Sequence, residues 1–97
     1  MRLSPEQVAI IRQAAQESFG PEARVWLFGS RVHDDKLGGD VDLFVENDQD
    51  LPVQALLRTQ ARIEYALRLP TDLVVQTPGH QAGPIANIAR MTGVRLA

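Results

Sequence analysis

Hydrophobic positions near the start of the chain recur at the three- and four-residue spacing of an amphipathic helix. They are Val8, Ile11, Ala15 and Phe19. Before them, Ser4 suits the N-cap, Pro5 suits the first helical position, and Gln7 completes a capping box. Gly20 and Pro21 follow, and we expect Gly20 to end the helix in the left-handed conformation. The pattern therefore predicts a helix over about residues 5–19.

Three short segments have the β-branched and aromatic content of strands. Residues 24–28 form an apolar run before Gly29, which is typical of a buried strand. Residues 71–76 are also predicted to form a strand. Residues 40–46 alternate in polarity, which predicts a strand with one side facing the core. In that strand one face carries Val41, Leu43 and Val45, and the other carries Asp40, Asp42 and Phe44.

Two further helices are predicted between and after these strands, over about residues 51–69 and from Pro84 to Gly93. The first has a predicted buried stripe of Val53, Leu56, Ile63 and Leu67, and the second carries Ile85, Ile88 and Ala89. The polar residues 30–37 have room for one short helix. The resulting order, αβ(α)βαβα, predicts a small α/β protein with helices packed on a sheet.

The 97 residues predict a single domain over residues 1–97. A hydrophobic content of 44% argues against disorder. The absence of cysteine excludes a disulfide scaffold, a thiol nucleophile and a cysteine-ligated zinc site, and it fits a reducing, cytoplasmic location. We find no signal-peptide pattern and no apolar run of the ~20 residues that a membrane helix needs.

Charge is distributed unevenly along a chain whose formal net charge is −2. Seven of the twelve acidic residues fall between Asp34 and Asp50, a clustering that usually indicates a solvated loop. Arg58, Arg62 and Arg68 lie on a predicted helix, as a solvated face or as a patch for an acidic partner. Tyr65 on that helix is expected to pack against the core. No basic groove or reading helix suggests that the protein binds nucleic acid.

The spacing of Asp40 and Asp42 points to chemistry. Residues two apart on a strand share a face, and their carboxylates, ~7 Å apart, repel each other unless a positive charge lies between them. Aspartate is also disfavoured in strands. A divalent cation would remove this cost, and oxygen ligands without nearby Cys or His suit Mg²⁺ or Mn²⁺.

Two other segments extend this candidate site. Asp72 begins the strand at 71–76 and would supply a third carboxylate if that strand lies beside the second. Three converging carboxylates suit a two-metal site for phosphoryl or nucleotidyl transfer. Gly29 and Ser30 follow the first strand, where backbone amides and a hydroxyl can hold phosphate oxygens. Arg31 can pair with a triphosphate.

Each of these signals alone also has a structural explanation, such as a turn or a capped strand end, but their order is specific. Gly29-Ser30-Arg31, eight residues and then Asp40-Val41-Asp42-Leu43 resemble the G-S-x(n)-D-x-D signature of the DNA polymerase beta-like nucleotidyltransferase superfamily. The small size resembles its minimal nucleotidyltransferase (MNT) branch, over nearly the whole chain. Gly39 departs from the pattern, because a serine commonly precedes the first aspartate.

The resemblance implies a small nucleotidyltransferase fold with a short mixed sheet of three to four strands. It also implies an enzyme that uses Mg²⁺, in two sites, to transfer a nucleoside monophosphate from a substrate such as ATP to a hydroxyl. By resemblance, Gly29 and Ser30 contact phosphates, Asp40 and Asp42 bind both metals, and Asp72 binds the catalytic metal and draws the acceptor proton.

Minimal members of this family often act with a small helical HEPN protein. In such pairs the MNT protein is an antitoxin that adds AMP to a tyrosine of the HEPN RNase. The short chain shows no second domain for an acceptor, which favours a partner chain or a homodimer. The alternative is a non-catalytic subunit that binds nucleotide or masks the toxin. A small-molecule transferase is a third, weaker interpretation.

Overall fold

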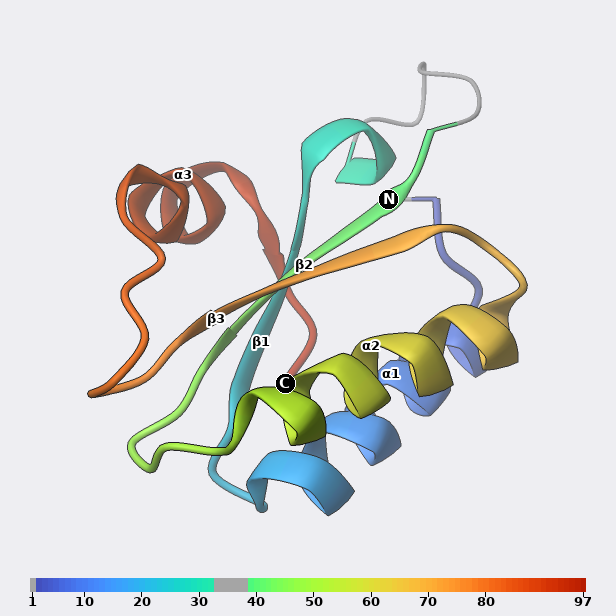
Figure 1. Ribbon diagram of the computed structural model, residues 1–97. Helices are drawn as coiled ribbons and strands as arrows, with labels where there is room; N and C mark the ends of the chain where they lie inside the picture. The colour runs from blue at the N-terminus through green and yellow to red at the C-terminus, as the bar shows by residue number, and fades with distance from the viewer. Residues whose placement is uncertain (1, 33–38) are drawn as a thin grey trace.

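The computed structural model describes residues 2–32 and 39–97. Its elements follow the predicted order up to the last helix, and two of the predicted strands match to the residue (Figure 1). A two-residue strand that the predicted order does not contain follows that helix. The elements are α1 (Pro5–Phe19), β1 (Arg24–Phe28), the 3-10 turn η1 (Gly29–Val32), β2 (Val41–Glu46), α2 (Val53–Leu67), β3 (Thr71–Gln76), α3 (Pro84–Thr92) and β4 (Val94–Arg95). The predicted short helix is confirmed only as η1, since residues 33–37 lie outside the described residues.

Helix α1 begins as predicted and ends in a different way. The Gln7 amide donates to the Ser4 hydroxyl at 3.1 Å, and the Ser4 amide donates to the Gln7 side chain at 2.8 Å. Gly20 ends the helix with φ 107° and ψ 170°, which is extended at positive φ and not left-handed helical. The predicted left-handed cap is therefore wrong, although the positive φ still explains a glycine.

The four strands form one mixed sheet in the order β3-β2-β1-β4. β1 pairs antiparallel with β2 and β4, whereas β2 and β3 are parallel and are joined through α2. Helices α1 and α2 cover one face of the sheet and α3 lies on the other (Figure 1). None of the helices in the described residues is long and apolar enough to cross a membrane.

The alternation in β2 sends its side chains to two separate hydrophobic clusters. Val41, Leu43 and Val45 are buried in the larger cluster, beneath α1 and α2. Phe44 is buried in the smaller one, where its ring centroid lies 5.4 Å from that of Trp26. Ala86 and Ala89 of α3 complete this second cluster. The second face of β2, which also carries Asp42, is therefore the face toward α3.

Two predicted burial positions, Val53 and Tyr65 on α2, are wrong. Val53 is 51% exposed, and Thr59 is buried instead, where its hydroxyl lies 2.8 Å from both the Ser18 hydroxyl and the Ala55 carbonyl oxygen. Tyr65, which the sequence predicts to pack against the core, is 87% exposed. On α3, Ile88 is half exposed, and the small Ala86 takes the buried place because α3 lies close above two aromatic rings.

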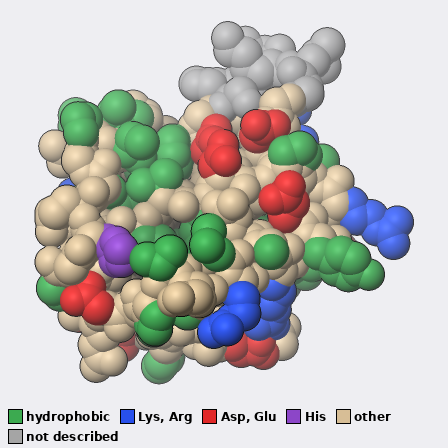
Figure 2. Space-filling model, in the orientation of Figure 1, with side chains coloured by type: hydrophobic (Ala, Val, Ile, Leu, Met, Phe, Trp, Pro, Cys, Tyr) green, Lys and Arg blue, Asp and Glu red, His purple; other side chains and the backbone are tan. Residues whose placement is uncertain are grey.

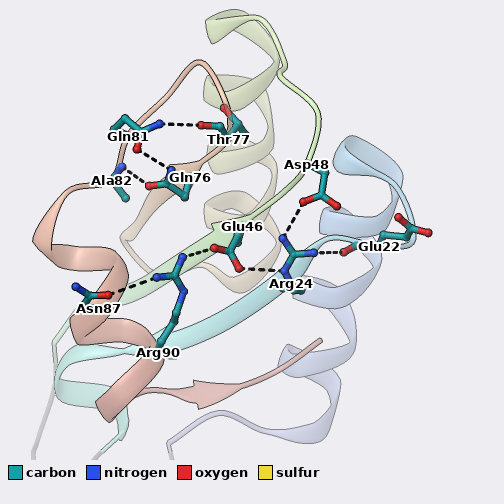
Figure 3. A network of polar contacts seen from close by, with 10 residues as sticks. All are labelled: Glu22, Arg24, Glu46, Asp48, Gln76, Thr77, Gln81, Ala82, Asn87 and Arg90. Atoms are coloured by element: carbon teal, nitrogen blue, oxygen red, sulfur yellow. Dashed lines mark hydrogen bonds and ion pairs between the residues drawn. The ribbon is translucent and has the colours of Figure 1, made fainter.

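A polar network fixes α3 to the sheet (Figure 3). The Glu46 carboxylate accepts from Arg24 Nε at 3.0 Å through one oxygen, and it is paired with Arg90 through the other. Arg24 also donates to Asp48 at 3.2 Å. The Arg90 guanidinium lies 5.6 Å from the centre of the Phe44 ring. One carboxylate therefore joins β1, β2 and α3.

Candidate functional site

Asp42 and Asp72 lie side by side on neighbouring strands. They are register partners in the parallel pair of β2 and β3. Leu43 and Leu73, the next residues in each strand, point into the core beneath α1 and α2. Both aspartates therefore face the α3 side of the sheet. The sequence left open whether Asp72 reaches the other carboxylates, and the strand order places it next to Asp42.

Asp40 is exposed and lies directly before β2, two residues from Asp42. The negative charge of Asp40 acts on the Asp42 carboxyl. Burial raises the pKa of the Asp42 carboxyl above its usual value, and the negative charges of Asp72 and Asp40 raise this pKa further. The three predicted acids therefore form one negative region in which ionised Asp42 is disfavoured. Figure 2 shows acidic side chains grouped on this face, beside hydrophobic side chains over α3.

Gly29 lies against the Asp42 carboxylate at the end of β1. The two segments meet because Phe28 is the register partner of Asp42. A Cβ placed on Gly29 would lie 3.2 Å from Asp42 Cγ and would overlap the carboxylate oxygen Oδ2. Gly29 also has φ 78°, a conformation that favours glycine. The sequence predicted a phosphate-binding glycine here, and the structure adds that the glycine makes room for Asp42.

Ser30 and Arg31 follow Gly29 in the η1 turn. The Arg31 guanidinium donates to the carbonyl oxygens of Arg2 at 3.1 Å and Gly39 at 3.3 Å. The Arg2 amide in turn donates to the Arg31 carbonyl at 2.8 Å. Arg31 thus ties the N-terminal segment to the residue before Asp40, a role that no local sequence pattern signals. The phosphate-binding roles of Ser30 and Arg31 remain predictions.

The donor set at this site fits a divalent cation in part. Asp42 and Asp72 offer carboxylate oxygens, the ligands that Mg²⁺ prefers, and the raised pKa of Asp42 indicates a place where added positive charge is favourable. Within residues 2–32 and 39–97, no group of three or more carboxylate or imidazole side chains is arranged to hold a metal ion. Asp42 and Asp72 are two candidate ligands on adjacent strands, and Asp40 is the third candidate.

Groups of the kind that nucleotidyl transfer uses lie together at one end of the sheet. Adjacent carboxylates from β2 and β3 lie next to a glycine turn that leaves β1. Carboxylates can hold cations and accept a proton, and a glycine turn lets phosphate approach the backbone closely. Phe28, packed at the edge of the Trp26–Phe44 cluster, adds an apolar surface next to Asp42.

Comparison with known proteins agrees with this geometry. A family model described as "Nucleotidyltransferase domain" matches residues 8–92, which include Gly29, Asp40, Asp42 and Asp72. No curated protein matches the chain. The match covers most of α1 and everything from β1 to α3, so the end of the sheet described above lies inside it. The chain belongs to the nucleotidyltransferase domain family.

Proposed function

We propose that this nucleotidyltransferase transfers AMP from ATP to a hydroxyl of a partner protein, as the antitoxin of a HEPN RNase. The observation that carries the transfer step is the pairing of Asp42 with Asp72 in adjacent parallel strands, with Gly29 against the Asp42 carboxylate. The family match supports nucleotidyl transfer in general. The protein acceptor and the toxin partner rest on the resemblance to minimal nucleotidyltransferases.

The reaction forms one oxygen–phosphorus bond and breaks another. The acceptor oxygen attacks the α-phosphorus, the bond from that phosphorus to the β-phosphate oxygen breaks, and pyrophosphate leaves. Asp72, which is exposed at the start of β3, takes the proton of the acceptor hydroxyl. The Gly29–Ser30 turn holds the phosphates through its backbone, and Asp40 and Asp42 complete the ligand set.

Mg²⁺ would be held by Asp40, Asp42 and Asp72, with Mn²⁺ as a substitute, and would neutralise the phosphates and activate the acceptor. The unfavourable ionisation of Asp42 supports this assignment, because the three acids repel one another without a cation.

The test uses ATP labelled on its α-phosphate, Mg²⁺ and the purified protein, together with a lysate of the source cell. Asp42→Asn serves as the inactive variant, and Asp48→Asn is the matched control because Asp48 is exposed and lies away from the site, paired with Arg24. We expect a labelled protein band with the wild type and with Asp48→Asn, and none with Asp42→Asn. Mass spectrometry of the band then identifies the acceptor residue.

The second candidate is a non-catalytic subunit that binds nucleotide or masks the toxin. It is favoured by the absence, among the described residues, of a ready-made group of three metal-ligating side chains. This candidate predicts that Asp42→Asn still neutralises the partner when the two are co-expressed. Loss of neutralisation by a folded Asp42→Asn protein, together with a labelled band, excludes masking alone.

A further inference from the structure

Helix α2 exposes an unusual row of apolar side chains. Val53 is 51% exposed, Leu57 is 59% exposed and Tyr65 is 87% exposed. Together with the exposed Ala61 they occur every four residues, so they form one stripe along the helix. We call Val53, Leu57, Ala61 and Tyr65 the α2 stripe. Contiguous exposed apolar surface that polar residues surround is typical of an interaction site.

The α2 stripe is distinct from the buried side of the same helix. Thr59, Ile63 and Leu67 face the core, and they too are four residues apart. The helix therefore has two apolar sides, and only the side of Ile63 and Leu67 packs against the core. The sequence prediction mixed them, because it placed Val53 in the buried row.

The charges beside the α2 stripe are mostly positive. Arg58 and Arg62 are exposed on α2 and Arg68 is exposed at its C-cap, against one acidic residue, Glu64. Arg62 is paired with Glu17 of α1. Arg58 and Arg68 make no side-chain ion pair with any residue that the structure describes. Two guanidinium groups without an ion pair to any described residue thus accompany the stripe, in a protein whose net charge is negative.

We propose that the α2 stripe, with Arg58 and Arg68, docks an amphipathic helix of a partner protein that carries acidic residues beside its apolar face. The apolar row matches such a helix by its spacing, and the two arginines match its charge. Helices α1 and α2 cover the sheet face opposite to Asp42 and Asp72, so a helix docked on α2 does not cover these two carboxylates. Figure 2 shows basic and hydrophobic side chains next to each other over α2.

The test measures binding of two synthetic helical peptides to the full chain by fluorescence anisotropy. Both carry leucines along one face, and their flanking positions are glutamate in one peptide and lysine in the other. We expect saturable binding of the glutamate peptide and none of the lysine peptide. The double variant Arg58→Glu, Arg68→Glu should bind the glutamate peptide at least about tenfold more weakly than the wild type does, and it should bind the lysine peptide.

Two matched variants separate this surface from general effects. Arg12→Glu removes an exposed arginine of α1, and Met91→Ser removes a residue of α3 that is 83% exposed. We expect both to bind the glutamate peptide as the wild type does, whereas Tyr65→Ser should weaken binding about tenfold. No saturable binding, or an equal loss with Arg12→Glu, would overturn the proposal.

A second copy of the chain is the rival occupant of the stripe. Sedimentation of the protein alone decides this point: a dimer that Leu57→Ser dissociates would overturn the proposal in favour of self-association. No nucleotide is present in either experiment, so a failure here leaves the transfer reaction untouched. In the same way, a negative result in the labelled-ATP experiment does not contradict the docking surface.

Discussion

Gly29 and Asp42 touch, and the contact leaves no room for a side chain at position 29. We predict that Gly29→Ala destabilises the fold and displaces the Asp42 carboxylate. Gly20→Ala is the control, because Gly20 has φ 107° but nothing within 4 Å of a Cβ. Backbone strain alone should cost Gly20→Ala about 1–3 kcal/mol. Chemical denaturation should show a larger loss for Gly29→Ala, and nucleotidyl transfer should fall only in that variant.

Equal losses of stability in the two glycine variants would contradict this expectation. They would mean that the Asp42 carboxylate moves aside without cost, and that position 29 requires glycine for its backbone conformation only.

Folding places Asp42 where its ionised carboxylate is energetically unfavourable. Burial and the charges of Asp72 and Asp40 raise its pKa, so the ionised form is disfavoured. We predict that Asp42→Asn raises Tm by about 2–8 °C without divalent cations, while nucleotidyl transfer is lost. Differential scanning calorimetry in a chelating buffer measures the first effect. Asp48→Asn, which removes a partner of Arg24, should give no rise.

A lower Tm for Asp42→Asn would show that the Asp42 carboxylate supports the fold, and the predicted site would then lose its main physical argument.

The elements were largely predictable from the sequence, and their contacts were not. Helix α1 and strands β1 and β3 have the predicted bounds because capping residues, glycines and prolines act locally. The buried side of α2 was predicted only in part, since burial of Thr59 depends on the Ser18 hydroxyl of α1. Long-range contacts of this kind leave no local pattern.

In the candidate site, too, local features were predictable from the sequence and contacts between distant segments were not. The alternation in β2 confirms the predicted shared face for Asp42 and Phe44. Asp40 lies before this strand, and its place on the same face stays a prediction. The position of Asp72 beside Asp42 required the strand order, which a single sequence does not contain. The bonds from Arg31 to the carbonyl oxygens of Arg2 and Gly39 were likewise unpredictable, because they close contacts between separate segments.

The attachment of α3 depends on Glu46. Burial alone would raise the pKa of Glu46, but hydrogen bonds and positive charge from Arg90 and Arg24 lower it below the usual value. A lowered pKa means that the ionised group stabilises the fold above the ordinary glutamate pKa, and that this contribution is lost as pH falls through the lowered pKa. We predict that Glu46→Gln costs about 1 kcal/mol near neutral pH.

Urea denaturation of the wild type and Glu46→Gln, from neutral pH into the acid range, checks this prediction. The difference in stability should shrink as Glu46 becomes protonated. A difference that stays constant at every pH would show that the substituted amide destabilises the fold through packing, with no part played by the charge.

Asp42 and Asp72 face the α3 side of the sheet, whereas the arginines of α2 belong to the helix layer on the other side. A cation should therefore be attracted to the α3 side. We predict that Mg²⁺ together with ATP raises the Tm of the wild type in a concentration-dependent way, because a ligand that binds only the folded state stabilises it. Chelation should reverse the rise.

Asp72→Asn should lose most of this stabilisation, and Arg58→Glu on α2 should keep it. Equal stabilisation of the wild type and Asp72→Asn would place the ligand elsewhere on the protein.

The chain has one tryptophan and one tyrosine, and the fold puts them on opposite sides of the sheet. Trp26 is buried beside Phe44 under α3, with the Arg95 guanidinium 5.2 Å from its ring, whereas Tyr65 stands on α2 in solvent. The molecule thus contains one buried optical probe on the α3 side of the sheet, toward which Asp42 and Asp72 also face. Selective excitation of tryptophan reports on events at that side, so a change in its emission indicates that a ligand has bound there.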